Sequence, residues 1–213
     1  MKGKTIYREL FLLILTILPI IYLLINWSTL PEKMPVHFDF NGEPNGYGSK
    51  LVFIFLPLGI YFAMLVLPLI DPRKKNYEIF GNTYFKLRII LTLFIGLINI
   101  MILYNTLHGL QKMGLFVPAS VFLLLTLIGN YLGNVRPNYF IGIKCPWTLN
   151  SDEVWTRTHK LAGKLWFWSG LFGIAALFFV KNPTSVMIPV VIIITIVPVV
   201  YSYIIYQKIQ KQQ

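Results

Sequence analysis

The sequence predicts an all-α membrane protein, a bundle of six transmembrane helices. Hydrophobic residues make up 56% of the 213-residue chain and charged residues only 13%, whereas a typical soluble domain has about 25% charged residues. The mean hydropathy is +0.65. In addition, six apolar segments are each long enough to cross a bilayer. This surplus of apolar surface is expected to face lipid.

The six apolar segments are continuous runs without the alternating polarity of a barrel strand. A spanning segment must satisfy its backbone hydrogen bonds internally or in a closed barrel, so these runs predict helices. The first run follows a basic N-terminus but lacks a cleavage pattern, and we interpret it as a retained span rather than a signal peptide. The segments cover residues 9–29, 51–70, 88–107, 115–133, 164–181 and 186–206.

The distribution of Lys and Arg predicts the orientation. Fifteen of these residues fall in the two terminal tails and in the loops after spans two and four, against four on the other side. The positive-inside rule therefore places both termini in the cytoplasm. The net charge of +11 is explained by the same rule, so we expect no direct contact with nucleic acid. The single cysteine, Cys145, excludes an internal disulfide and a cysteine-based metal cluster.

The middle of each span contains no Asp, Glu, Lys, Arg or His. Proton-coupled carriers and pumps usually need such residues near the midplane, so the pattern disfavours an ion-coupled transporter. Asn99 and Asn130 are the notable polar side chains in the spans. We interpret them as partners in hydrogen bonds between helices.

The extracytoplasmic loop 30–50 is expected to form a small ordered cap. Val36, Phe38 and Phe40 alternate with His37 and Asp39, which predicts a short strand. The dipeptides at 41–42 and 45–46 predict turns. His37 and Asp39 would share one face of that strand. Such a pair can bind a metal or act as acid and base, but no third ligand is nearby, and we favour packing or ligand contact.

The cytoplasmic loop 134–163 is the second informative segment. Asn150 followed by Glu153 indicates a capping box and hence a helix start. The expected helix is short and amphipathic, lies at the inner leaflet and leads into span five. His159 is interpreted as a packed hydrogen-bond donor, and Cys145 as an inert thiol. One stripe of the helix holds Trp155, His159, Ala162, Gly163 and Trp166, and another holds Arg157, Lys160 and Lys164.

These motifs carry a family resemblance. The run 138–149, followed by Val154-Trp155, Thr158-His159 and Ala162-Gly163, resembles the signature of the SdpI family of bacterial membrane immunity proteins. The outer loop resembles the domain of unknown function that accompanies it, and Asp71-Pro72-Arg73-Lys74 also fits. The chain departs from the family pattern at positions 144, 145 and 45. Lys144 keeps the charge of an arginine but lacks its planar fork. The resemblance divides the chain into a two-span hairpin, 1–87, and a four-span SdpI-like region, 88–213.

The resemblance implies an immunity protein of the bacterial cell membrane that resists a secreted membrane-active peptide toxin. It also implies signalling, in which a small helix-turn-helix repressor is held at the membrane. Besides lipid, the expected partners are therefore the toxin and this repressor. The candidate toxin contacts are His37, Asp39, Asn41, Tyr47 and Lys50. The cytoplasmic signature comprises Arg136, Pro137, Asn138, Gly142, Lys144, Pro146, Trp147, Thr148, Trp155, Thr158 and His159.

Two other functions compete with immunity. A transporter of small amphiphilic compounds is suggested by the proline-bearing spans and disfavoured by their lack of midplane charge. An enzyme is disfavoured because the sequence has no paired intramembrane carboxylates, no His-x-x-x-His and no nucleophile elbow. We therefore expect no catalytic residue, no metal and no cofactor.

Overall fold

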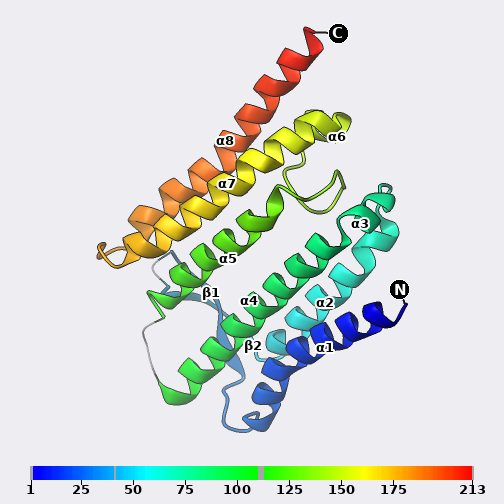
Figure 1. Ribbon diagram of the computed structural model, residues 1–213. Coiled ribbons are helices and arrows are strands. Elements are labelled where there is room, and N and C mark those ends of the chain that lie inside the picture. The colour runs from blue at the N-terminus through cyan, green and yellow to red at the C-terminus, as the bar shows by residue number, and fades with distance from the viewer. Residues whose placement is uncertain (1, 41, 110–112, 213) are drawn as a thin grey trace.

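The computed structural model describes residues 2–40, 42–109 and 113–212 (Figure 1). It is mostly helical, with one two-stranded hairpin. The elements in chain order are α1 (Lys2–Ile25), β1 (Lys33–Phe38), β2 (Pro44–Ser49), α2 (Val52–Ile70), α3 (Lys75–Ile79), α4 (Gly81–His108), α5 (Phe116–Leu132), α6 (Pro146–Asn150), α7 (Asp152–Leu177) and α8 (Thr184–Gln210).

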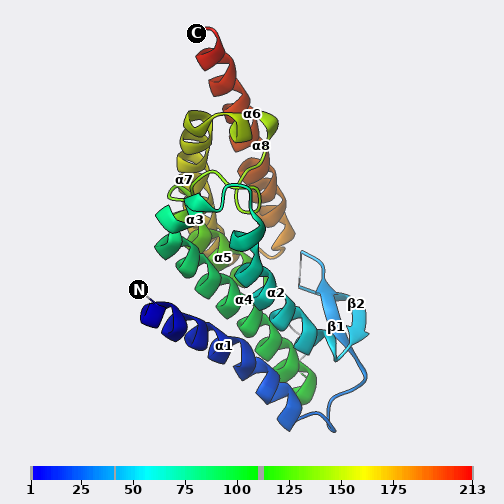
Figure 2. The same cartoon turned by 90° about the vertical axis from the view of Figure 1, so that its right-hand side faces the viewer.

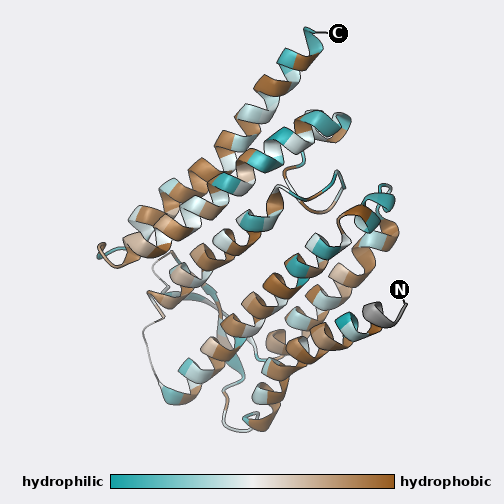
Figure 3. Ribbon diagram, viewed as in Figure 1, coloured by the Kyte–Doolittle hydropathy of each residue, from teal (hydrophilic) through white to brown (hydrophobic). Residues whose placement is uncertain are grey.

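Six long helices, α1, α2, α4, α5, α7 and α8, correspond to the six predicted segments. In the described part of the chain, four stretches are long and apolar enough to cross a membrane: Ile6–Ile25, Val52–Ile70, Gly81–His108 and Thr184–Gln210. Helix α5 is apolar but shorter. In the view coloured by hydropathy, apolar residues run along the middle of the helices (Figure 3). The predicted helical class therefore agrees with the structure. The number of six crossings and the cytoplasmic position of both termini stay predictions.

The long helices fall into two groups of three (Figures 1 and 2). Helices α1, α2 and α4 pack on one another and form the N-terminal triad, whereas α5, α7 and α8 form the C-terminal triad. The two triads meet where α4 packs on α5. The boundary expected between residues 87 and 88 falls inside α4, and the division into those two regions stays a prediction.

Close backbone contacts hold the C-terminal triad together. A Cβ atom added to Gly129 on α5 would lie 2.8 Å from the carbonyl oxygen of Gly163 on α7. A Cβ at Gly163 would in turn lie 2.8 Å from the carbonyl oxygen of Gly129. Further along α7, a Cβ at Gly170 would lie 2.5 Å from the Phe122 carbonyl oxygen of α5, whereas Gly173 lies against the Phe122 ring. Small residues let helix backbones approach in membranes, so α5 and α7 form a tightly fitted pair.

Polar contacts hold the N-terminal triad together. Arg88 on α4 donates to both carboxylate oxygens of Glu9 on α1, at 2.5 and 2.7 Å. The Tyr61 hydroxyl of α2 donates to Glu9 at 3.4 Å. Helix α4 begins seven residues before the predicted span, so Arg88 lies inside the helix and is buried. Asn99 donates to the Phe53 carbonyl at 3.2 Å, which confirms its predicted contact between helices.

The predicted amphipathic helix differs from the one observed in two respects. Helix α7 begins one residue later than expected, with Ser151 as its N-cap accepting from the Val154 amide at 3.3 Å. Asn150 cannot cap it because this residue ends the preceding helix α6. The segment leads directly into the fifth apolar stretch, as predicted, but its apolar stripe does not lie on the surface of the protein. The helix continues without a break to Leu177, and the stripe that includes Trp155 and His159 is buried within the protein.

Candidate functional site

The hairpin covers one end of the bundle. Strands β1 and β2 pair in antiparallel register, with Lys33 opposite Ser49 and Pro35 opposite Tyr47. The register shifts between Pro35 and His37 and again between His37 and Phe38. Met34 is fully buried and fixes the strand on the bundle. The predicted strand is thus confirmed, although it begins earlier than expected and ends before Asp39.

The structure does not bring His37 and Asp39 together as a pair. The His37 ring contacts the Asn45 side chain across the hairpin. The Asp39 carboxylate accepts from the Glu43 amide at 2.9 Å and so closes the turn. No cluster of three His, Cys, Asp or Glu side chains occurs among the described residues.

Of the other predicted toxin contacts, Tyr47 and Lys50 have opposite environments. Tyr47 is 62% exposed, whereas Lys50 is only 4% exposed. Lys50 pairs with Glu32 at 2.9 Å, donates to the Trp27 carbonyl at 3.2 Å, and its ammonium lies 4.2 Å from the centre of the Trp27 ring. Lys50 therefore anchors the hairpin to the end of α1. The remaining predicted contact, Asn41, lies outside the described residues.

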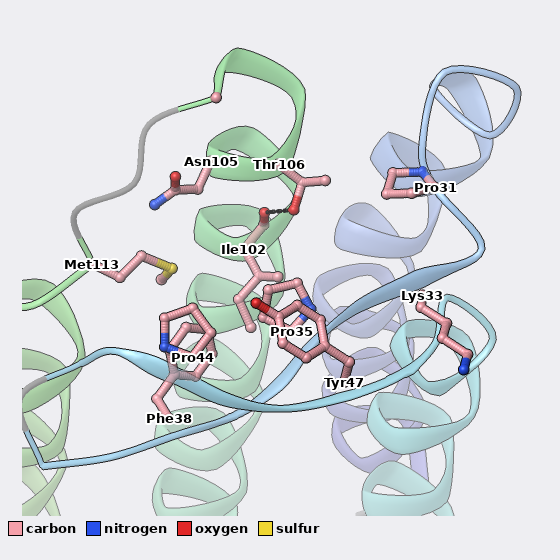
Figure 4. Close-up of a pocket in the computed structure, with 11 residues that line it drawn as sticks. Pro31, Lys33, Pro35, Phe38, Pro44, Tyr47, Ile102, Asn105, Thr106 and Met113 are labelled. Carbon is pink, nitrogen blue, oxygen red and sulfur yellow. Dashed lines mark hydrogen bonds between the residues drawn. The ribbon is translucent and has the colours of Figure 1, made fainter.

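A pocket lies between the hairpin and the end of α4 (Figure 4). Its volume is about 310 Å³, and it is open on one side. Its lining is largely apolar, with Pro35, Phe38 and Pro44 from the hairpin facing Ile102 and Met113. Of the predicted toxin contacts that the structure describes, Tyr47 is the one that lines it. The pocket suits apolar side chains better than a polar solute.

At the other end of the bundle, buried polar side chains form a network that we call the motif node: Asp71, Tyr77, Asn138, Thr148, Trp155 and His159. Asn138 lies at its centre and is completely buried. Its amide nitrogen donates to the carbonyls of Arg136 and Ile141, both at 2.9 Å. Its oxygen accepts from the Phe140 and Ile141 amides at 2.9 and 2.6 Å. This single side chain therefore shapes the loop 136–141.

Asp71, just after α2, ties the N-terminal triad to this loop. One carboxylate oxygen accepts from the Arg73 amide at 2.7 Å. The other accepts from the Tyr139 amide at 2.9 Å and from the Tyr77 hydroxyl at 3.2 Å. Burial and the neighbouring carboxylate of Asp71 raise the pKa of Tyr77, which keeps its hydroxyl a donor. Arg73 donates to the Leu149 carbonyl at 2.6 Å.

His159 is fixed as a neutral imidazole. Its Nε2 accepts from the Ile143 amide at 2.9 Å, so the proton resides on Nδ1, which donates to the Trp155 carbonyl at 2.8 Å. Burial lowers the pKa of His159 to about 4. The ring stacks on Trp155 at 4.0 Å between centroids. Gly142 has φ +120°, and a side chain there would overlap the His159 ring. The predicted donor role of His159 is confirmed at Nδ1, and Nε2 is in addition an acceptor.

The other signature residues divide between buried contacts and exposed surface. The Trp147 indole donates to the Ser202 hydroxyl at 2.6 Å and so joins α6 to α8. The Thr148 hydroxyl accepts from the Cys145 amide at 2.8 Å and donates to the Ile143 carbonyl at 2.9 Å. Burial also raises the pKa of the Cys145 thiol, which disfavours the reactive thiolate. Pro137 and Thr158 are buried, whereas Arg136, Lys144 and Pro146 are exposed.

Comparison with known protein families gives one match that contains the outer loop 30–50 and another that contains the cytoplasmic loop 134–163. Residues 134–202 match the model of the SdpI/YfhL protein family. Residues 14–61 match the model of a domain of unknown function, DUF1648. Immunity protein SdpI of Bacillus subtilis (strain 168) is 26% identical over 210 residues, which are 95% of this chain and 97% of that protein. No solved structure matches the chain.

The chain is a multi-pass protein of the cell membrane, as its four long apolar helices and its similarity to immunity protein SdpI indicate. Its matched SdpI/YfhL region contains the part of the motif node from Asn138 to His159, and its DUF1648 region contains the hairpin. Two residues that complete these structures lie outside the predicted site set. Asp71 belongs only to the Asp71–Lys74 motif of the family resemblance, and Trp27 is not among the predicted contacts. The Asp-Pro motif directly after a span was the feature of the sequence that could have identified Asp71 as a site residue.

Proposed function

We propose that this protein is a non-catalytic immunity protein of the SdpI family that resists a secreted membrane-active peptide toxin. The observation that carries the proposal is the similarity to an immunity protein along 95% of the chain. The match includes both the hairpin and the cytoplasmic motif, and not one region alone. An immunity function also suits a site that offers binding surfaces without an acid–base pair.

The hairpin end offers the surface on which such a peptide would bind. His37 and Tyr47 are exposed, and an apolar pocket lies directly beneath the strands. A membrane-active peptide presents both apolar and polar side chains, and the rim and the pocket complement these two kinds of group. Because Lys50 is anchored internally, we assign it to support of the hairpin, and we assign recognition to Tyr47 and the pocket.

The proposal extends to signalling by sequestration of a small helix-turn-helix repressor. The loop 136–145 presents Arg136, Tyr139 and Lys144 on the exposed side of the rigid motif node. A contact connects the hairpin to the C-terminal triad, since a Cβ at Gly42 in the hairpin turn would lie 2.6 Å from the Gly114 Cα before α5. Helix α5 is fitted to α7, which carries Trp155 and His159. These helices would have two arrangements that differ at the cytoplasmic surface. Toxin binding shifts the protein from one to the other only if the toxin binds one arrangement more tightly.

The first experiment is a killing assay. The chain is expressed in a toxin-sensitive bacterium, and survival is measured against a panel of secreted membrane-active peptides. We expect protection against at least one peptide relative to cells with the empty vector. Unchanged killing by every peptide, with the protein present in the membrane at normal levels, would contradict the immunity function.

The second experiment separates the cytoplasmic motif from simple folding. Trp147→Ala removes the indole that joins α6 to α8, and we expect it to abolish protection while membrane insertion is retained. Trp168→Ala is the matched control, because Trp168 lies on α7 and is 50% exposed. Full protection by Trp147→Ala would refute the role of the motif. Recruitment of a fluorescent repressor to membranes, lost in the same variant, tests the signalling part.

A further inference from the structure

The pocket under the hairpin adjoins a second cavity between the two triads. The second cavity has a volume of about 560 Å³, which is in the range of ligand-binding pockets. Asn105 and Met113 line both hollows, so the two lie side by side. Figure 4 shows these two side chains at the edge of the hairpin pocket, on the far side from Lys33. Together the hollows form one site with an outer and a deeper part.

The deeper cavity reaches well into the apolar part of the bundle. It extends along α4 from Asn105 to Leu97, eight residues or about 12 Å of helix. It is open toward the surrounding membrane, and Leu97 and Leu123 at its edge are each 42% exposed. Apart from Asn105, Ser120 and the Tyr104 hydroxyl, the described residues of its lining offer apolar groups. A ligand can therefore enter from the lipid, sideways between α4 and α5.

The outer part of the site decides between a phospholipid and a peptide as the occupant. A phospholipid with a chain in the deeper cavity would place its charged headgroup near Pro35, Phe38 and Pro44, where desolvation of the charge is costly. Among the described residues of the outer lining, the one charged side chain, Lys33, lies on the opposite side from Asn105 and Met113. A helical peptide segment satisfies its own backbone hydrogen bonds and can be apolar along its whole length.

We propose that the combined cavity binds the apolar segment of the membrane-active peptide, which enters laterally from the lipid between α4 and α5. This inference rests on the proposed immunity function and specifies where its ligand binds. The hairpin then covers the end of the bound segment, and the deeper cavity accepts its apolar side chains. Resistance follows because the peptide is captured within the bilayer, where it acts.

A pair of matched variants tests the site in the killing assay, with the peptide that the wild-type protein resists. Leu123→Trp fills the cavity. Leu127→Trp makes the same change one turn further along α5, at a residue that is 40% exposed and does not line the cavity. Ala119→Phe is a second filling variant. We expect at least a tenfold loss of survival for both filling variants and none for Leu127→Trp, at equal protein levels.

The outcomes separate the two proposals. No protection by the wild-type protein refutes the immunity function and this inference with it. Protection by the wild-type protein that is retained in Leu123→Trp and Ala119→Phe refutes only the cavity as the binding site.

A direct binding measurement complements the assay. In a Cys145→Ser background in nanodiscs, Leu123→Cys or Leu127→Cys carries a bimane label, and the synthetic peptide carries a tryptophan that quenches bimane. We expect several-fold stronger quenching at position 123 than at 127. Equal quenching at both positions overturns the inference. As a second arm, brominated phospholipid is added to the labelled protein. If it quenches the bimane at position 123 and the peptide does not displace it, the cavity binds lipid, and this result also overturns the inference.

Discussion

The two ends of the molecule use polar side chains in opposite ways. At the motif node, Asn138, His159 and Thr148 are completely buried, and their polar groups bond within the protein. At the hairpin end, His37 and Tyr47 are exposed above an open apolar pocket. A buried, satisfied network makes a structure rigid and unique, whereas an open pocket with an exposed rim can bind a partner. We therefore expect substitutions at the motif node to affect stability first, and substitutions at the hairpin to affect protection.

The largest effect on stability is expected for Asn138→Ala. The substitution removes four hydrogen bonds to the backbone and leaves buried amides and carbonyls without partners. With about 1 kcal/mol for each bond and 1–3 kcal/mol for each buried orphan group, the loss should be at least about 3 kcal/mol. Thermal unfolding in nanodiscs measures it. Asn45→Ala, on the exposed hairpin, is the control, and equal losses in the two variants would contradict the comparison.

The buried imidazole predicts a pH dependence of similar size. Because burial lowers the pKa of His159 to about 4, against about 6.5 in an unfolded chain, only the unfolded state binds this proton between those values. Stability therefore falls as the pH is lowered from about 6.5 to 4, by roughly 3 kcal/mol in total. Unfolding midpoints measured across this range check the slope. His159→Phe should be less stable at pH 7 but should lose this slope, and an unchanged slope would refute the assignment.

A smaller loss, about 2 kcal/mol, is expected for Glu9→Gln. This change weakens the bidentate pair with Arg88 that joins α1 to α4. The estimate lies below the 3–5 kcal/mol of a fully buried pair, because the Glu9 side chain is 28% exposed. Glu78→Gln, at an exposed position on the short helix α3, should change the unfolding midpoint little. If Glu9→Gln also changes the unfolding midpoint little, the pair does not hold the N-terminal triad together.

The smallest effect on stability is expected at the rim of the pocket. Tyr47→Ala removes a side chain that is 62% exposed, and exposed substitutions usually change stability by less than about 0.5 kcal/mol. Its unfolding midpoint should match that of the wild-type protein. A large decrease would show that the hairpin end is also a structural element and would remove the contrast between the two ends.

The sequence predicted the long helices and the first strand of the hairpin because these depend on local patterns: continuous apolar runs and alternation. The turn expected at residues 45–46 was wrong, since these residues lie in β2. It could not predict which polar side chains meet, since those contacts join distant segments. Asp71 and Tyr139 are 68 residues apart, and Glu9 and Arg88 are 79 apart. The error at α7 has the same origin. A stripe of Trp155 and His159 has the same period whether it faces lipid or the loop 134–145, and only the fold places that loop against it.

The most direct test of the account is the protection given by Tyr47→Ala, measured beside its unfolding midpoint and its level in the membrane. The account predicts at least a tenfold loss of survival against the peptide that the wild-type protein resists, with midpoint and level unchanged, because the side chain lines the pocket but does not support the fold. Full protection by Tyr47→Ala would contradict the claim that this end of the bundle recognises the toxin.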